Sequence, residues 1–337
     1  MTQKNNITIS IDCMGGDDNV SDIISGVNDY YTENKTDLFL LHGDKSKIYP
    51  HLNKYTQLIK NCTLLHTEKS VEMDDKPAQT IRSGRKSSMW NAIESVKKKK
   101  ANVIVSCGNT GSLMAISTFL LRRLPQVKRP AIAIFWPSLS KSGFNIVLDA
   151  GADIKAQPSD MVTYANFGSI ICNKVFSLER PKVGLLNVGT EAHKGDDQMR
   201  EASSLLAKES ELKGFEYCGF VEGSDFSSNK VDVIVTDGFT GNIALKTAEG
   251  TANLIKQFFV QEFKSSARGI LSGLIFRGKL QKLKEKMDPR RLNGGVFVGL
   301  DGLVIKSHGS SDSKSFYSAL KLAKNVCKSD YNLETKD

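Results

Sequence analysis

A glycine-rich turn with small polar residues is the part of this sequence best suited to chemistry. It runs Gly108-Asn109-Thr110-Gly111-Ser112, follows an apolar, β-branched stretch, and precedes apolar residues at helical spacing. A strand that turns through glycines into a helix exposes backbone N–H groups at the positive end of the helix dipole, and Asn109 or Thr110 suits the N-cap. The turn predicts a site for phosphate or a developing oxyanion. A tight turn without a ligand is the alternative, because the sequence has neither the dinucleotide fingerprint nor the P-loop lysine here.

The same pattern, an apolar strand that ends in glycine and polar residues, recurs along the chain. Four further turns show it, at residues 12–17, 149–153, 187–191 and 237–242. Ligands of open α/β sheets bind at the carboxyl ends of the strands, so we expect the five turns to share one edge of the sheet. Together they favour an enzyme with a phosphate-sized site over a set of merely structural turns.

Two residues that follow a predicted strand at Val304-Ile305 can supply charge or a proton. Lys306 can neutralise an anion, and His308 is the best general acid or base among the five histidines. The alternative for His308 is a side chain that only forms a hydrogen bond within a neighbouring turn.

These residues must be positioned by an α/β fold. Apolar strands alternate with helical stretches throughout, which is typical of a largely parallel sheet. The segment from Lys76-Pro77 to Lys97–Lys100 predicts one long basic helix. We find no low-complexity linker and no short repeat, so we expect a single domain over residues 5–328 and a polar tail over 329–337.

The composition limits the partners. With 337 residues, 40% apolar and 25% charged, the chain is globular, and its net charge of +9 favours an acidic partner, an anionic membrane or phosphate-bearing substrates. Aromatic residues are sparse and not interleaved with basic ones, so we expect no nucleic-acid surface. The six cysteines are scattered, which argues against disulfides and zinc and for a reducing cytosol. There is no apolar leader and no apolar run of about 18 residues, so we expect a soluble or peripheral cytoplasmic protein.

A basic amphipathic segment lies at residues 266–291. Apolar residues cluster over 270–276 and continue at helical spacing, and eight basic residues surround them against only Glu285 and Asp288. This pattern indicates a membrane-surface anchor or a docking face. A dimer or core helix pair with a solvated basic face is the alternative.

The ordered turns resemble the bacterial phosphate acyltransferases, the acyl-ACP:phosphate acyltransferases of phospholipid synthesis. The matching segments are Asp12-Cys13-Met14-Gly15-Gly16-Asp17, Lys76-Pro77 with Ser87-Ser88-Met89, Gly108-Asn109-Thr110-Gly111, Leu148-Asp149-Ala150-Gly151-Ala152, Gly184-Leu185-Leu186-Asn187-Val188-Gly189, Lys194-Gly195, Asp237-Gly238-Phe239-Thr240-Gly241-Asn242, Gly294-Gly295 and Lys306-Ser307-His308-Gly309-Ser310-Ser311-Asp312. They follow the family's order over nearly the whole chain. Cys107 and Thr190 depart from the family, which usually has alanine and an acidic residue there.

The resemblance implies a three-layer α/β/α fold like that of isocitrate dehydrogenase and phosphotransacetylase, with a large mixed, mostly parallel sheet, assembled as a homodimer. It implies transfer of a long-chain acyl group from acyl carrier protein to inorganic phosphate. A membrane glycerol-3-phosphate acyltransferase would then use the acyl phosphate, which favours peripheral contact with the inner face of the membrane. Arg82, Arg85, Lys86 and Lys97–Lys100 are either a steering surface for the acidic carrier or solvated helix faces.

For this chemistry the protein needs to position phosphate, neutralise its charge and stabilise the thioester oxyanion. We predict His308, Lys306 and Asn242 as catalytic residues. The predicted binding residues are Gly15, Gly16, Asp17, Gly108, Asn109, Thr110, Gly111, Ser112, Asn187, Gly189, Asp237, Gly238, Gly241, Gly309 and Ser310.

We predict no metal and no cofactor. Asp149, Asp153 and Asp237 have the side chains for a metal site, but helix capping accounts for them as well. A covalent acyl-cysteine at Cys107 is less favoured than a buried filler, because no base is adjacent to it in sequence. The alternative functions are phosphotransacetylase-like or dehydrogenase-like activity on the same fold, and a non-catalytic membrane-associated scaffold.

Overall fold

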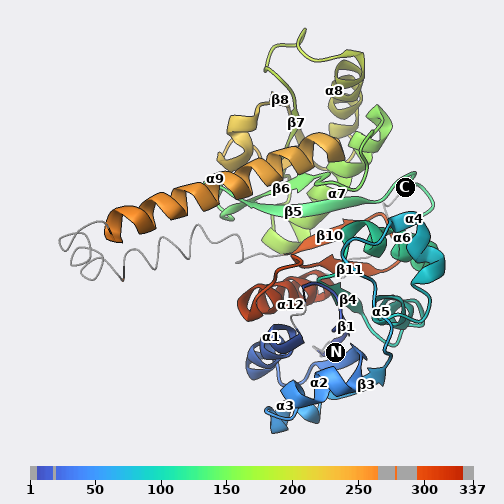
Figure 1. Cartoon of the computed structure of the whole chain (residues 1–337). Helices are drawn as coiled ribbons and strands as arrows, with labels where there is room; N and C mark the ends of the chain where they lie inside the picture. Colours follow the sequence, from blue (N-terminus) through green and yellow to red (C-terminus); the bar gives the residue numbers. More distant parts are fainter. Residues whose placement is uncertain (1–5, 18–19, 265–277, 279–293, 329–337) are drawn as a thin grey trace.

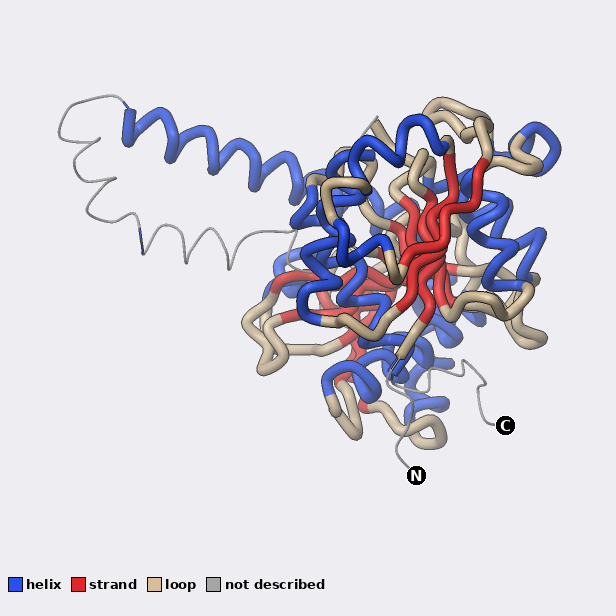
Figure 2. Tube along the Cα trace, turned by 90° about the horizontal axis from the view of Figure 1, so that it is seen from below, coloured by secondary structure: helices blue, strands red, loops and turns tan. Residues whose placement is uncertain are grey.

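One twisted sheet of eleven strands forms the centre of the protein, with helices on both faces (Figure 1, Figure 2). The computed structural model describes residues 6–17, 20–264, 278 and 294–328, and the sheet order is β3-β2-β1-β4-β11-β10-β5-β6-β9-β7-β8. The strands are β1 (Thr8–Asp12), β2 (Leu38–Gly43), β3 (Cys62–His66), β4 (Val103–Ser106), β5 (Ala131–Pro137), β6 (Phe144–Leu148), β7 (Lys182–Leu186), β8 (Glu216–Val221), β9 (Val233–Val235), β10 (Gly295–Val298) and β11 (Leu303–Lys306).

The two halves of the sheet run in opposite directions. β1 to β4 and β11 are parallel to one another, whereas β10 is antiparallel to both β11 and β5, and β6 is antiparallel to β5. β9, β7 and β8 then continue parallel to β6. The predicted mixed, mostly parallel sheet is confirmed. The expectation that all five turns share one carboxyl edge is wrong, because the strands before 149, 187 and 237 point the other way.

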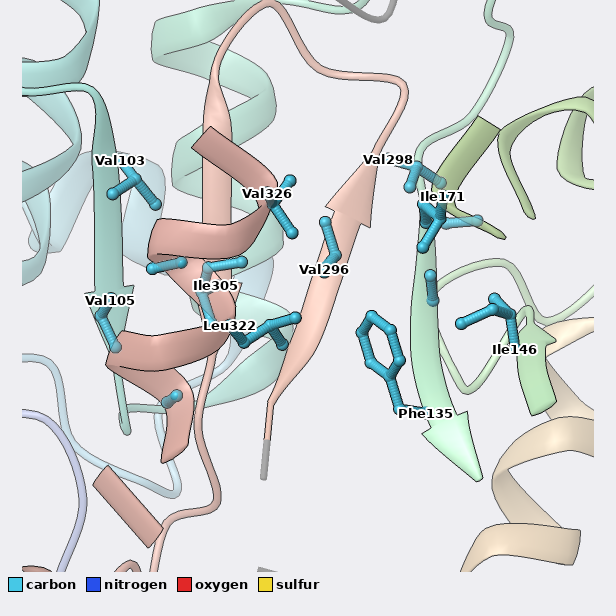
Figure 3. Packing of buried hydrophobic residues seen from close by; sticks show 14 of the residues in the cluster. Val103, Val105, Phe135, Ile146, Ile171, Val296, Val298, Ile305, Leu322 and Val326 are labelled. Carbon is cyan, nitrogen blue, oxygen red and sulfur yellow. The ribbon is translucent and has the colours of Figure 1, made fainter. Parts of the chain in front are cut away.

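Helices cover the sheet as two outer layers. In the described residues they are α1 (Val20–Glu33), α2 (Lys45–Leu52), α3 (Thr56–Ile59), α4 (Pro77–Ser83), α5 (Ser88–Lys97), α6 (Thr110–Leu121), α7 (Pro158–Phe176), α8 (Asp197–Ser210), α9 (Gly238–Lys264) and α12 (Ser313–Lys328), with a short 3₁₀ helix at Gly223–Ser227. Alternate residues of one strand enter different cores: Val103 and Val105 join the cluster under α1, α7 and α12, and Ile104 joins that under α5 and α6. Figure 3 shows Leu322 and Val326 of α12 over β11 and β10.

The predicted basic helix over residues 76–100 is two helices. Pro77 begins α4 at a favourable first position, the chain breaks at Gly84, and the Ser87 hydroxyl oxygen caps α5 by accepting from the Trp90 N–H at 3.2 Å. α4 packs on α6, whereas Lys97–Lys100 precedes β4 and therefore lies at the amino edge of the sheet. The two basic groups consequently lie at different ends of this half of the molecule.

The amphipathic segment at 266–291, except for Gly278, and the tail at 329–337 lie outside the described residues. Before that segment, α9 extends away from the sheet (Figure 1), and most of the described side chains in its outer half are exposed. Among the helices described, none combines the length and apolar character needed to cross a membrane.

Candidate active site

A row of four polar residues crosses adjacent parallel strands where they end. Strand register places His42 of β2 beside Asp12 of β1, Asp12 beside Ser106 of β4, and Ser106 beside Lys306 of β11. Residues in register on neighbouring strands point to the same face of the sheet. This row underlies the predicted turns at 12–17, 108–112 and 306–311, which the structure does bring together.

Asp12 and Ser106 form the floor of the site. Asp12 is buried, and one of its oxygens accepts a hydrogen bond of 2.7 Å from the Ser106 hydroxyl. The Ser106 oxygen in turn accepts from the Gly108 N–H at 3.0 Å. Burial raises the pKa of Asp12, while the neighbouring hydroxyl groups and the charge of Lys306 oppose that shift. A side chain at Gly15 would lie 2.6 Å from the Asp12 carboxylate and 2.7 Å from the Gly108 nitrogen, so the close approach of these turns requires glycine.

The N-terminus of α6 has the predicted form but fewer free donors than predicted. Asn109 is the N-cap: its carbonyl oxygen accepts from the Ser112 N–H at 2.9 Å, and its amide donates to the backbone oxygens of Met73 and Asp75. The Asn109 side chain and the N–H groups of Gly108 and Ser112 are therefore occupied within the protein. Within the described chain, the N–H groups of residues 109–111 have no acceptor and remain available to an anion.

Lys306 places a half-buried ammonium group next to this turn. Its Nζ donates to the carbonyl oxygen of Cys107 at 3.1 Å and to that of Ser307. An ammonium group has three donors, so one is left without a partner among the residues that the structure describes. Burial lowers the pKa of Lys306 to about 8, although the charge of Asp12 acts in the opposite direction.

His308 is exposed at the edge of the same site. Its Nδ1 accepts from the Ser310 N–H at 3.3 Å and lies 2.9 Å from the Ser310 hydroxyl, so the neutral ring carries its hydrogen on Nε2. Partial burial lowers the pKa of His308, with Lys246 and Lys306 acting in the same direction and Glu249 against them. The ring is held by its own turn through one nitrogen, and the other can face a ligand.

The glycine turns are tied to one another by the backbone. The N–H of Asp17 donates to the carbonyl oxygen of Gly309 at 3.2 Å, which joins the first turn to the last. Gly16 has a φ of 95°, a left-handed conformation that favours glycine. A side chain at Gly111 would meet Pro77 at 2.5 Å, which fixes α4 against α6. Three loops far apart in sequence thus form one surface.

The predicted residues of the second half form a separate cluster. Strand register across β10 and β5 aligns Val147 of β6 with Lys306 of β11. Because β6 and β11 run in opposite directions, the chain after Leu148 continues in the opposite direction from the chain after Lys306. Asp237 caps α9 by accepting from the Thr240 N–H at 2.8 Å. Gly241 packs against this loop, since a side chain there would lie 1.9 Å from the Asp149 carbonyl oxygen.

The remaining residues of that half also have local partners. Gly238 lies against Asp149, exposed Asn242 packs on Gly151, and the Asn187 amide donates to the Lys194 carbonyl oxygen at 3.2 Å beside Gly189. Helix α9 connects this half with the first. The charges of its Lys246 and Glu249 act on the pKa of His308, and the charge of Lys246 also acts on the pKa of Lys306. Among the described residues, no hydrogen bond joins Asn242, Asn187 or Gly189 to the row at Lys306.

Cys107 and the aspartates take structural roles. Cys107 is buried, as predicted, and burial raises the pKa of its thiol to about 11, which disfavours the nucleophilic thiolate. Asp149 accepts from the N–H groups of residues 132 and 151–153. Asp153 pairs with Arg129 at 3.0 Å. In the described ranges, no three His, Cys, Asp or Glu side chains are grouped as metal ligands would be.

Asp12 and Ser106 are absent from the residues predicted from sequence. Asp12 stands two residues before the Met14-Gly15-Gly16 turn, and this position at the end of a strand was the available signal. Ser106 ends an otherwise apolar strand and differs little from a structural serine. Their partnership depends on the pairing of β1 with β4, 94 residues apart.

Comparison with known proteins connects this geometry to a family. Residues 7–334 match the family described as "Fatty acid synthesis protein". The chain is 46% identical to a phosphate acyltransferase of Cereibacter sphaeroides, covering 98% of this chain and 90% of that one. It is 48% identical to a phosphate acyltransferase of Roseobacter denitrificans, covering 96% and 90%.

Solved structures support the fold. A phosphotransacetylase from Streptococcus pyogenes aligns with a TM-score of 0.62 at 14% identity, covering 96% of this chain and 95% of that one. A 4-hydroxythreonine-4-phosphate dehydrogenase from Klebsiella pneumoniae aligns with a TM-score of 0.52 at 11% identity, covering 95% and 97%. These likenesses show a shared architecture that serves different reactions. On the matched length and identity of its relatives, the chain belongs to the phosphate acyltransferase family and is an acyltransferase.

Proposed function

We propose that this protein transfers a long-chain acyl group from acyl carrier protein to inorganic phosphate and releases acyl phosphate. The observation that carries this proposal is the Lys306 ammonium with a spare donor beside the free N–H groups of residues 109–111. An ammonium and a helix N-terminus together suit a small, highly charged oxyanion. The names of the relatives support phosphate as the acceptor.

The reaction needs no covalent enzyme intermediate. A phosphate oxygen attacks the thioester carbonyl carbon, a carbon–oxygen bond forms, the carbon–sulfur bond breaks, and the thiol leaves as a thiolate that takes up one proton. An ordinary thiol has a pKa of about 8.5, so it leaves without a strong acid. In this proposal Lys306 and the α6 N-terminus orient phosphate, the Nε2–H of His308 donates a hydrogen bond to the developing thiolate, and the proton that the thiolate takes up is the one that hydrogen phosphate loses.

The donor is proposed to be the carrier-bound thioester. The net charge of +9 favours an acidic protein partner. Arg82 lies in α4 and Arg85 follows it, and both side chains are exposed. α4 packs on α6, whereas Lys97–Lys100 lies at the far edge of the sheet. We therefore place carrier steering at Arg82 and Arg85. Charge reversal of both is expected to raise the KM for the acyl carrier, and the same change at Lys97 and Lys98 is the matched control.

The deciding experiment offers the pure protein three substrates in parallel. We expect acyl phosphate from palmitoyl-carrier protein and inorganic phosphate, detected by hydroxylamine trapping. Turnover of acetyl-CoA alone would favour phosphotransacetylase-like chemistry, and turnover of a nicotinamide cofactor would favour a dehydrogenase. No turnover of any substrate by folded protein would favour a scaffold.

We also propose that α9 carries a homodimer contact. Leu254, Phe258 and Phe259 are 49%, 59% and 48% exposed on a helix that extends from the body (Figure 1). A run of exposed apolar side chains is typical of an interface. Binding of the adjacent 266–291 segment to the inner face of the membrane would bring the acyl phosphate to a membrane glycerol-3-phosphate acyltransferase.

The two roles separate experimentally. Phe258→Glu is expected to produce a monomer in light scattering, and Leu274→Glu is expected to reduce co-sedimentation with anionic vesicles without changing the dimer. A dimer that persists in Phe258→Glu would place the contact elsewhere. Unchanged vesicle binding of Leu274→Glu would remove the membrane role from 266–291.

A further inference from the structure

Asp12 is a buried carboxylate beside a site that we propose for an anion. Its position at the end of β1 is within the row that continues through Ser106 to Lys306. The Asp12 carboxylate would repel a phosphate this close unless donor groups between the two interacted with its charge. The contacts of Asp12 show which groups these are.

Asp12 reaches the phosphate turn through one hydroxyl group. Ser106 donates to the Asp12 carboxylate at 2.7 Å and accepts from the Gly108 N–H at 3.0 Å. This orients the Ser106 hydroxyl and turns the Gly108 N–H inward, so that the next three N–H groups face outward from the end of α6. Gly15 keeps the space between Asp12 and the Gly108 nitrogen open.

Asp12 also acts on Lys306 by charge. The two residues lie two strands apart in register, about 10 Å between Cα atoms at ordinary strand spacing. Lys306 donates to backbone carbonyl oxygens and forms no ion pair within the part of the chain that is described. The charged and titratable groups that act on it are Cys107, Asp12, Lys246, Asp17 and His308. Of these, Asp12 is the buried carboxylate of the row.

We propose that Asp12 is a positioning residue for phosphate, which orders the Gly108 turn through Ser106 and keeps the Lys306 ammonium charged at the N-terminus of α6. The proposal rests on the function proposed above and extends it to a residue that does not touch the substrate. Two variants separate the two routes: Asp12→Asn removes the charge and keeps the shape, whereas Ser106→Ala keeps the charge and breaks the connection to Gly108.

The experiment measures the KM for phosphate, the KM for the acyl donor and the alkaline limb of activity in each variant. Asp12→Asn is expected to raise the phosphate KM about 10-fold and to shift the alkaline limb down by about one pH unit, since an attractive charge near an ammonium raises its pKa. Ser106→Ala is expected to raise the phosphate KM without shifting the alkaline limb of the pH–activity profile. The KM for the acyl donor stays within about 2-fold in both, because neither change alters uniform binding of that substrate.

Asp37→Asn is the matched control, because Asp37 is equally buried and also lies near a lysine. It is expected to lower stability without changing the phosphate KM or the limb. Calorimetric titration with inorganic phosphate gives the same comparison without turnover. If the wild type makes no acyl phosphate, the proposed function fails. If the wild type is active and Asp12→Asn keeps both the phosphate affinity and the limb, this inference fails. If Asp12→Asn does not fold, an unchanged phosphate KM in Ser106→Ala overturns it.

Discussion

Two buried aspartates near lysines lie at opposite ends of the same parallel half-sheet, and their hydrogen bonds differ. At the amino edge, Lys324 of α12 lies 2.8 Å from the Asp37 carboxylate and 2.7 Å from the Asn34 side chain. The same carboxylate accepts from the Tyr30 hydroxyl at 2.6 Å and from the Ile7 N–H at 3.2 Å. Every charge there is neutralised by a partner in the protein.

At the carboxyl edge, Asp12 and Lys306 are not in direct contact. Asp12 is bonded to Ser106, and Lys306 to two carbonyl oxygens that carry no net charge. A half-buried ammonium without an anion is costly, and in the proposed function a bound anion supplies the missing charge. A buried Asp near a Lys is thus common to the two ends, and what differs is that Asp37 contacts Lys324 whereas Asp12 and Lys306 have separate partners.

The largest expected effect separates the two lysines by stability. Lys324→Met leaves a buried carboxylate without its cation and should lower the free energy of unfolding by ~3–5 kcal/mol. Lys306→Met removes an ammonium whose charge has no anionic partner and should change it by less than ~1 kcal/mol. Urea denaturation of both variants makes the measurement. Equal losses would mean that the protein neutralises both lysines to the same extent.

Catalysis should show the reverse pattern. Lys306→Met is expected to lower kcat/KM for phosphate ~100-fold, the usual cost of losing one preorganised donor to a reacting oxyanion. Lys324→Met, assayed per folded molecule, should stay within ~3-fold, because it lies at the other edge of the sheet. A Lys306→Met enzyme with normal phosphate kinetics would move the anion site to another loop.

The alkaline limb of the pH dependence should come from Lys306. The pKa of Lys306 is lowered to about 8, so the ammonium is present below that pH and is lost as the pH rises through it. Phosphate affinity should therefore fall above pH 8, by ~10-fold per pH unit once most of the lysine is neutral. Lys306→Arg keeps its charge and should remove this limb. A limb that persists in Lys306→Arg would assign the titration to a different group.

The smallest effect tests how fully the amino-edge pair is satisfied. Tyr30→Phe removes one hydrogen bond to the Asp37 carboxylate and should cost ~1.5–3 kcal/mol, the range for bonds to a charged group. Tyr31→Phe, the partly exposed neighbour on α1, should change stability by less than ~0.5 kcal/mol. Thermal unfolding of the two variants is compared. A similar loss for both would mean that the hydroxyl of Tyr30 adds nothing to the pair.

Local patterns were sufficient for the parts of the fold that depend on near neighbours. The strand before Gly108, the N-cap at Asn109 and the helix that follows are confirmed, because an apolar β-branched run and a capping side chain act within a few residues. β10 was not predicted, since a four-residue strand next to glycines has little local signal. β10 is antiparallel to both β11 and β5, so those two strands run in one direction. The antiparallel pairing of β5 with β6 reverses the second half of the sheet and separates turns that look alike in sequence.

Taken by itself, the sequence determined the family, the α/β class and the glycine turns, because these depend on residue types in order along the chain. Only the tertiary structure decided which turns meet. Strand register placed Asp12 beside Ser106 and Ser106 beside Lys306, and the reversed direction of β6 and β9 separated the turns at Asp149 and Asp237 from them. The physical reason is that hydrogen-bond partners and the neutralisation of buried charge are set by pairing between distant strands.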